Sequence, residues 1–263
     1  MLKRAFDILC AAILLTLSLP LLAVAAFLIK LDSEGPVIFH QHRMGRRFMR
    51  FRLFKLRTMN LHGEGPAYTL GADPRITRVG RWLRRYKIDE VPQLWNVMRG
   101  DMSMVGPRPV IPELAFEFDW AYARLLAVRP GLTDPASLKY SNETEILAAV
   151  PDAYRHFKRV ITPDKIRISL AYLQHAGVWT DFALVVKTAL ALVSPALRQR
   201  FGPAAARHDP ALRISVAPQI VIRREAEPLR RRITTPVKCE VPVRVIQRSK
   251  PNRVASDRDS WTI

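Results

Sequence analysis

Two adjacent carboxylates, Asp89 and Glu90, lie in a strongly cationic stretch of the chain. Three of the five residues before them are basic: Arg84, Arg85 and Lys87. Pro92 predicts the first turn of a helix just after the pair, and the N-terminal end of a helix keeps a carboxylate ionised and also binds phosphate. Two interpretations follow. Either Asp89 caps this helix and Glu90 complements its dipole, or the pair acts on a phosphate that the cations, Arg85 among them, help to bind.

A second cationic motif, Gly106-Pro107-Arg108-Pro109, follows within twenty residues. Two prolines restrict the backbone around Arg108, so its guanidinium is held ready to bind phosphate through two hydrogen bonds. The alternative is a salt bridge at a turn. If the two motifs meet, one carboxylate of the pair could attack phosphorus and form an acyl-phosphate. Its neighbour could then hold Mg²⁺ against the phosphate oxygens.

The histidines offer a weaker metal site. His40 and His42 are the nearest pair, and they fit the surface of a predicted strand without a metal. The chain also shows no zinc-type spacing of Cys and His.

An apolar N-terminal segment indicates that this chemistry takes place at a membrane. Between Asp7 and Lys30 the chain has 22 uncharged residues. As a helix they reach ~33 Å, enough to cross a hydrocarbon core. A cleaved signal peptide is disfavoured because no small-residue cleavage site precedes Lys30. Pro20 lies near the middle of the run and predicts a kink, and Ser18 is placed to satisfy one backbone group that the proline frees.

Positive charge flanks this segment on both sides, so the positive-inside rule does not choose an orientation. A straight span, a buried helix and a broken helix all remain open at this point. The broken helix would enter and leave by the cytoplasmic face, which satisfies both flanks. The chain's net charge of +19 favours anionic partners such as lipid headgroups, nucleic acid or phosphorylated small molecules. A non-enzymatic basic membrane-surface protein is therefore a rival interpretation, whereas no nucleic-acid-binding module is present.

The other elements must position the two motifs. Strand formers at 37–42 and 50–57, with Gly45 between them, predict a hairpin, and a short basic helix is expected at 81–87. Residues 100–112 read as a Gly/Pro connector, and helices are expected at 113–128, 152–159, 163–175 and 178–193. The helix at 178–193 has few charges, so we expect it to be buried or to lie in a membrane interface.

The predicted fold class is mainly α with a small β-hairpin (α+β), together with a proline-broken re-entrant membrane helix and interfacial amphipathic helices. The expected domains are a membrane helix at 1–31, a catalytic domain at 32–195 and a basic, proline-rich tail at 196–263.

Several long motifs resemble one family. "FKLRTM", "DPRITRVGRWLRRYKIDEVPQLWNVMRGDMSMVGPRP" and "VRPGLTD" are similar to the bacterial sugar transferases, the monotopic phosphoglycosyl transferases. The similarity covers roughly residues 3–193. It implies transfer of a sugar-1-phosphate from a UDP-sugar to undecaprenyl phosphate with release of UMP, at the cytoplasmic face of the bacterial inner membrane and its anionic lipids.

The resemblance also implies roles for single residues. Asp89 is expected to be the nucleophile that forms a phosphosugar-enzyme intermediate, and Glu90 is expected to hold Mg²⁺ beside it. Arg108, Lys55 and Arg57 are expected near the phosphates. The family's re-entrant helix is expected to break at Ser18-Leu19-Pro20, which departs from the usual Ser-Pro. After "PGLT" the chain reads "DPASLKYSNE" where many members have Gly-x-x-Gln, a change expected to affect sugar selectivity. A member that has lost activity and regulates a partner is a third interpretation, which the intact motifs argue against.

Overall fold

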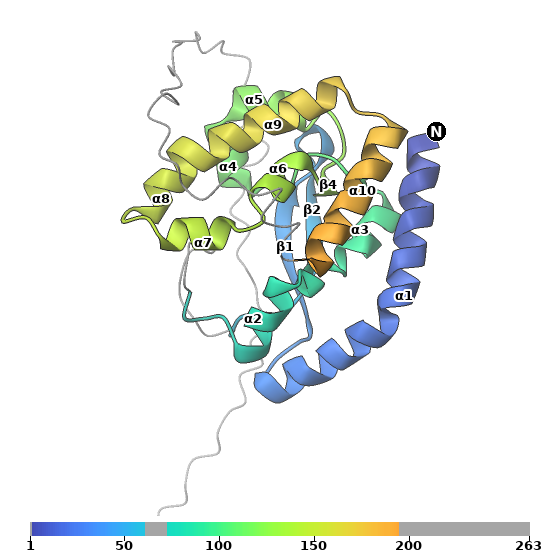
Figure 1. The fold of residues 1–263 in the computed structure, drawn as a ribbon, viewed down its shortest axis with the longest axis vertical. Helices are drawn as coiled ribbons and strands as arrows, with labels where there is room; N and C mark the ends of the chain where they lie inside the picture. Colours follow the sequence, from blue (N-terminus) through green and yellow to red (C-terminus); the bar gives the residue numbers. More distant parts are fainter. Residues whose placement is uncertain (1, 61–72, 195–263) are drawn as a thin grey trace, which may run out of the picture. The chain divides into compact units, whose positions relative to one another are not determined.

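The structure, a computed structural model, describes residues 2–60 and 73–194. Helices dominate the described part, beside two small two-stranded sheets (Figure 1). The helices are α1 (Leu2–Asp32), α2 (Arg78–Arg85), α3 (Gln93–Arg99), α4 (Pro112–Glu117), α5 (Asp119–Leu125), α6 (Pro135–Lys139), α7 (Glu143–Ala148), α8 (Ala153–His156), α9 (Thr162–Gln174) and α10 (Val178–Val193). The strands are β1 (Ile38–Met44), β2 (Arg50–Leu56), β3 (Ser103–Val105) and β4 (Gly131–Thr133). The prediction of a mainly helical fold with a hairpin is confirmed, while the expected tail at 196–263 lies outside the described residues.

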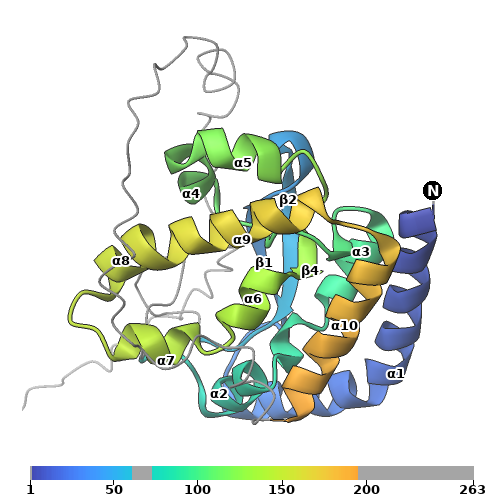
Figure 2. The ribbon, with the colours of Figure 1, turned by 45° about the horizontal axis from the view of Figure 1, so that its top comes forward.

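The apolar N-terminal segment forms one continuous helix, α1, with Pro20 inside it. The helix bends part-way along, so that its second half turns toward α2 (Figures 1 and 2). A proline favours such a bend because it lacks the N–H that would bond to the carbonyl of Thr16. The Ser18 hydroxyl donates to the carbonyl of Leu15, at 2.9 Å, and not to that of Thr16. The expected break is therefore a bend in an unbroken helix, and Ser18 does not replace the bond that Pro20 removes.

The expected hairpin is present as the antiparallel pair β1 and β2. Its register pairs Phe39 with Lys55 and Arg43 with Phe51. Because paired residues of an antiparallel sheet point to the same face, Arg43 and Lys55 share one face of the hairpin. The tight turn after Gly45 spans Arg46–Phe48, and Arg47 and Phe48 in it both have a positive φ.

The Gly/Pro connector contains a strand that the sequence analysis missed. β3 pairs in parallel with β4, which lies at the "PGLT" motif. The backbones of these two segments approach closely at Gly106 and Gly131. A Cβ added to Gly131 would lie 2.1 Å from the nitrogen of Gly106. Such short strands carry little pattern of their own, so their pairing depends on this contact. The pairing holds the start of the Gly106–Pro109 motif against β4, where the N–H of Gly131 donates to the carbonyl of Pro107 at 2.9 Å.

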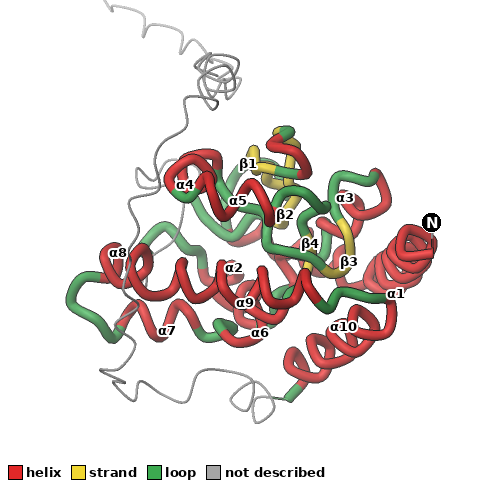
Figure 3. The backbone as a smooth tube through the Cα atoms, turned by 90° about the horizontal axis from the view of Figure 1, so that it is seen from above, coloured by secondary structure: helices red, strands yellow, loops and turns green. Residues whose placement is uncertain are grey.

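The helical prediction was right in outline and wrong in several of its boundaries. The stretch expected at 113–128 divides into α4 and α5 at Phe118, and α8 continues through a π-helical turn into α9. Two short helices, α6 and α7, were not predicted. The last helix, α10, has the expected bounds and lies alongside α1 (Figures 2 and 3).

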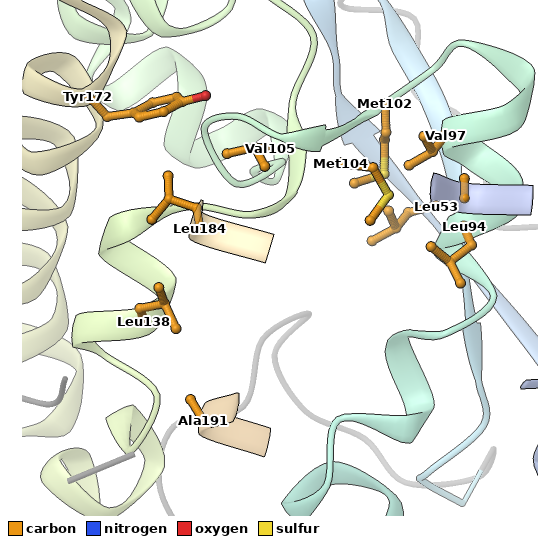
Figure 4. Close-up of a cluster of buried hydrophobic side chains, with 11 residues drawn as sticks. Leu53, Leu94, Val97, Met102, Met104, Val105, Leu138, Tyr172, Leu184 and Ala191 are labelled. Atoms are coloured by element: carbon orange, nitrogen blue, oxygen red, sulfur yellow. The ribbon is translucent and has the colours of Figure 1, made fainter. Parts of the chain in front are cut away.

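A buried core joins the elements that carry the site. Its side chains come mainly from β2, α3, β3, α6, α9 and α10, and Figure 4 shows them. Ala11 of α1 is also fully buried in this cluster. A second cluster packs the later part of α1, at Ala25 and Ile29, against Leu56 and Leu83. The two clusters hold α1, the hairpin and the helices around Asp89 in one body.

Candidate active site

The adjacent carboxylates lie in a short 3₁₀ turn, Ile88–Glu90, between α2 and α3. Lys87 precedes the turn with a φ of 57°, and Gly100 ends α3 with a φ of 93°, in the left-handed region that glycine favours. Asp89 and Glu90 are both buried, with exposed fractions of 5% and 8%. The interpretation of Asp89 as the cap of the following helix is wrong, because Pro92 is the N-cap residue of α3 and no side chain caps it.

Glu90 is held by two cations from distant parts of the chain. Arg108 donates to both of its carboxylate oxygens, with 3.1 Å between Arg108 Nη1 and Glu90 Oε2. Lys55 of β2 lies 3.5 Å from Oε1. Burial alone would raise the pKa of Glu90, but the charges of Arg108 and Lys55 hold this pKa well below its usual range. Glu90 is therefore ionised, and the structure brings the two sequence motifs into direct contact.

Asp89 has a different environment although it is the next residue. Its Oδ1 is buried and accepts no hydrogen bond from any residue that the structure describes. Burial, and then the negative charge of Glu90, raise the pKa of Asp89, while Lys55, Lys87 and Arg84 oppose the rise. The result is a carboxylate that several cations surround and that no described donor binds at Oδ1.

Among the basic residues before the pair, the charges of Lys87 and Arg84 act on Asp89, and Arg84 is the one that is partly buried. Its Nε donates to the Thr58 hydroxyl at 2.8 Å, and burial lowers its pKa against the opposing charge of Asp89. Arg85, one of the predicted phosphate-binding residues, is exposed, and its guanidinium carbon lies 5.9 Å from the centre of the Tyr86 ring. The 3.6-residue period of α2 separates adjacent side chains by about 100°, and this rotation turns Arg85 away when Arg84 faces the site.

Arg57, another predicted site residue, lies at the end of α1 and not at the carboxylate pair. It is 3% exposed, and its guanidinium donates to the carbonyls of Ser33, Glu34 and Gly35 at the end of α1. These bonds fix the exit of α1, so the structure does not bring Arg57 together with the carboxylate pair. Lys55, two residues earlier on the strand, is the member of this segment that reaches Glu90.

Sequence reasoning missed Arg43 as a site residue. Its Nη2 donates to Gln41 at 2.7 Å, while its Nε is buried and has no hydrogen-bond partner among the described residues. Burial, and then the charge of Arg108, lower the pKa of Arg43 to about 10. Strand alternation could have found this residue, because pairing across the hairpin places Arg43 and Lys55 on one face.

The carboxylate pair fits one mode of binding Mg²⁺. Within residues 2–60 and 73–194 there is no group of three or more His, Cys, Asp or Glu placed to hold a metal. Mg²⁺ is commonly held by only one or two carboxylates together with substrate phosphates and water. The unbonded Oδ1 of Asp89 and the ionised Glu90 match that donor set, whereas His40 and His42 are both exposed on β1.

Comparison with known proteins places this site in a family. The family model described as "Bacterial sugar transferase" matches residues 1–195. The UDP-glucose:undecaprenyl-phosphate glucose-1-phosphate transferase of Caulobacter vibrioides is 38% identical over 206 residues, which cover 73% of this chain and 70% of that protein. The exopolysaccharide production protein ExoY of Rhizobium meliloti is 32% identical over 72% of this chain and 84% of its own length.

The undecaprenyl-phosphate glucose phosphotransferase of Komagataeibacter xylinus is 38% identical over 71% of this chain, but this chain spans only 35% of that longer protein. The shared region includes the Asp89-Glu90 turn, Arg108 and Lys55, because the family match runs from residue 1 to residue 195. With most of its length matched, the chain belongs to the bacterial sugar transferase family.

Proposed function

We propose that this protein transfers a sugar-1-phosphate from a UDP-sugar to undecaprenyl phosphate and releases UMP, which initiates a membrane-linked glycan such as an exopolysaccharide. The observation that carries the proposal is the buried Asp89, whose Oδ1 has no described hydrogen-bond partner, beside the Glu90–Arg108 ion pair. The name of the Caulobacter relative describes this transfer for glucose-1-phosphate, and that of the Rhizobium relative refers to exopolysaccharide production.

The proposed reaction has two displacements at one phosphorus. An oxygen of Asp89 bonds to the sugar-linked phosphorus as the bond from that phosphorus to UMP breaks, and UMP takes the electron pair. An oxygen of undecaprenyl phosphate then attacks the same phosphorus, and the Asp89 carboxylate leaves. The products are UMP and undecaprenyl diphosphate sugar, and Asp89 returns to its starting state.

The cations around the pair have a shared task in this scheme. Lys55, Arg84 and Lys87 all favour the ionised form of Asp89, which is the form that attacks. Arg108 and Arg43 add positive charge where the diphosphate must lie, and fixed charges in a buried site stabilise developing negative charge. Arg108 also keeps Glu90 ionised, so that its carboxylate stays available as a metal ligand.

We propose that Glu90, with an oxygen of Asp89, holds Mg²⁺ when the donor is bound. The metal would neutralise phosphate oxygens and polarise phosphorus. The residues of the chain do the rest: they bind the diphosphate, orient Asp89 and exclude water from it.

Helix α1 supports a membrane location. It is long and apolar enough to cross a bilayer by length and composition. Large apolar side chains remain exposed along it and along the neighbouring α10, including Leu17, Phe27, Trp179 and Val193. A surface of this kind on two adjacent helices fits contact with lipid.

We further propose that α1 is re-entrant, with both ends at the cytoplasmic face. Near its start, Lys3 pairs with Asp181 of α10, and Arg4 donates to the carbonyl of Val97 at 2.7 Å. At its end, Asp32 accepts from the backbone N–H of Val79 at 2.9 Å. Both ends thus bind one folded body, which lies on one side of the bilayer. The chain's basic charge would then face anionic lipid headgroups.

The reaction is tested by mixing membranes that contain the protein with undecaprenyl phosphate, Mg²⁺ and a panel of UDP-sugars. UMP release over many turnovers is expected with at least one sugar and should require all three components. Asp89→Asn should lower the rate by at least about 10⁴-fold and remove the phosphosugar-protein adduct, which is detectable by mass. Full turnover by Asp89→Asn would exclude this residue as the nucleophile.

A non-enzymatic membrane-surface protein makes the opposite prediction. Vesicle binding would fall steeply with salt, would not depend on Asp89, and no UDP-sugar would release UMP. The contact between Glu90 and Arg108 favours the enzyme, since surface attraction alone does not require buried carboxylates.

A further inference from the structure

A cavity of about 210 Å³ adjoins the candidate active site and has no role in the reaction described above. Its wall is formed by residues of α4, α5, α6, α9 and the turn before α9, and by Arg43 and Arg108. Tyr122, Leu125 and Ile166 supply apolar surface. Ligand sites commonly combine such a surface with a few polar groups that fix orientation.

Several polar groups at the wall are buried. Thr162 is 2% exposed, and its hydroxyl has no hydrogen-bond partner among the described residues. Asp134 is 1% exposed and accepts from the Ser137 N–H at 2.7 Å and the Ser169 hydroxyl at 2.9 Å. Lys165 pairs with both oxygens of Glu143 at 2.7 Å. A buried polar group without a partner is costly, and the Thr162 hydroxyl has no described protein bond that it would have to give up to a ligand.

Two arginines belong to both the cavity and the carboxylate site. Arg108 binds Glu90 and also lines the cavity. Arg43 lines the cavity, and its charge interacts with Glu90. A phosphate bound by these arginines would therefore place its substituent at the cavity.

The geometry points to the cavity as the subsite for the sugar of the donor, with Thr162, Lys165 and Glu113 at its wall to recognise hydroxyl groups. This inference rests on the proposed function. The sugar is joined by one oxygen to the phosphorus that Asp89 attacks, so it stays near Arg108 throughout. The nucleoside is carried by the leaving phosphate, which departs on the side opposite the attacking oxygen. The cavity is also below the roughly 300–1,000 Å³ typical for drug-sized ligands, and so it suits a single hexose better than a whole nucleotide.

The test compares donors in two variants at the cavity wall. Thr162→Val removes the unpartnered hydroxyl with almost no change in shape. Glu113→Gln changes a wall residue that is exposed, so its folding is not at risk. The matched control is Thr144→Val, the same loss of a hydroxyl at an exposed position of α7 outside the cavity wall. For each protein, kcat/KM for UMP release is measured with UDP-glucose, UDP-galactose and UDP-N-acetylgalactosamine, together with inhibition by UMP.

We expect Thr162→Val or Glu113→Gln to change the ratio of kcat/KM between two donors by about five- to tenfold, the value of one lost hydrogen bond. UMP inhibition and the control should not change. Equal ratios in wild type and both variants would overturn the sugar subsite, and so would weaker UMP inhibition with unchanged ratios, which would assign the cavity to the nucleoside. If wild type released no UMP from any donor, the proposed function would fail as well, and this outcome is distinct from the other two.

Discussion

Asp89 and Glu90 are adjacent in sequence but differ in their electrostatic surroundings. Arg108 and Lys55 bind Glu90 and hold its pKa well below the usual range, whereas burial raises the pKa of Asp89. Two carboxylates with opposite shifts are suited to different roles. Asp89, with its raised pKa and an Oδ1 that no described donor binds, fits a nucleophile. Glu90, whose pKa is held low, fits a ligand for a cation.

The raised pKa of Asp89 has a consequence for stability. A group whose pKa is higher in the folded protein stabilises the fold while it is protonated, and this stability is lost as the pH rises through the folded pKa. At pH 7 the ionised Asp89 is therefore unfavourable for folding. We therefore expect Asp89→Asn to raise Tm at pH 7, although it abolishes turnover.

Thermal unfolding of both proteins at pH 7 and at pH 4 checks this prediction. The gain should shrink at pH 4, where wild-type Asp89 is more protonated. A lower Tm for the variant at pH 7 would contradict the unfavourable burial of this charge.

The pH dependence of the first chemical step gives a second test at this scale. Asp89 must be ionised to attack, so single-turnover UMP release should fall as the pH drops through its raised pKa. Lys55 lowers this pKa, and Lys55→Met should move the acid limb of the profile to higher pH. Arg81→Met, which removes a charge at an exposed position of α2, is the control and should leave the limb in place. An unchanged limb in Lys55→Met would show that Lys55 does not control the ionisation of Asp89.

At the scale of elements, the pairing of β3 with β4 decides where Arg108 lies. The two backbones meet at Gly106 and Gly131 with no space for a side chain. This contact sets the position of the chain on both sides of Arg108. The position of the Gly106–Pro109 motif thus depends on a glycine 23 residues away from Arg108 in sequence.

Gly131→Ala is expected to disrupt this contact. The new Cβ would lie 2.1 Å from the Gly106 nitrogen, so the backbone must shift. Overpacking of this kind typically costs about 1–3 kcal/mol, and the displaced Arg108 should also lower kcat/KM. Gly177→Ala is the matched control, because a Cβ at that position meets nothing within 4 Å. Denaturant unfolding and UMP release measure the two effects, and equal behaviour of the variants would argue against a fixed β3–β4 contact.

At the scale of the whole molecule, α1 is attached to the folded body at both ends. Lys3 and Arg4 bind α10 and α3, while Arg57 and the N–H of Val79 bind the other end. These contacts favour a helix that returns to the side from which it entered. A straight span would have to break one set of them.

Cysteine labelling tests this topology. Leu2→Cys and Glu34→Cys place single thiols at exposed positions near the two ends of α1, in a background where Cys10 and Cys239 are serine. In sealed inside-out vesicles, both cysteines should react with a membrane-impermeant maleimide, and neither should react in right-side-out vesicles. Labelling from opposite sides would establish a spanning helix and exclude the re-entrant one.

Sequence patterns predicted well where they are local. The hairpin, the basic helix before the carboxylate pair and the bounds of α10 all follow from strand alternation, helical periodicity and flanking Gly or Pro residues. The motif residues Asp89, Glu90 and Arg108 were also named from sequence. Short elements with few residues, such as β3, β4 and α6, carry too little periodicity to be recognised alone.

The sequence by itself determined the residue types of this protein: a carboxylate pair among cations, an arginine between prolines and an apolar segment long enough for a membrane. Only the tertiary structure decided which cation contacts which carboxylate. It turned Arg84 and not Arg85 toward Asp89, placed Arg57 at the end of α1 and added Arg43 to the site. The physical reason is that charge and hydropathy belong to single residues, whereas ion pairing and burial depend on distances between segments that are far apart in the chain.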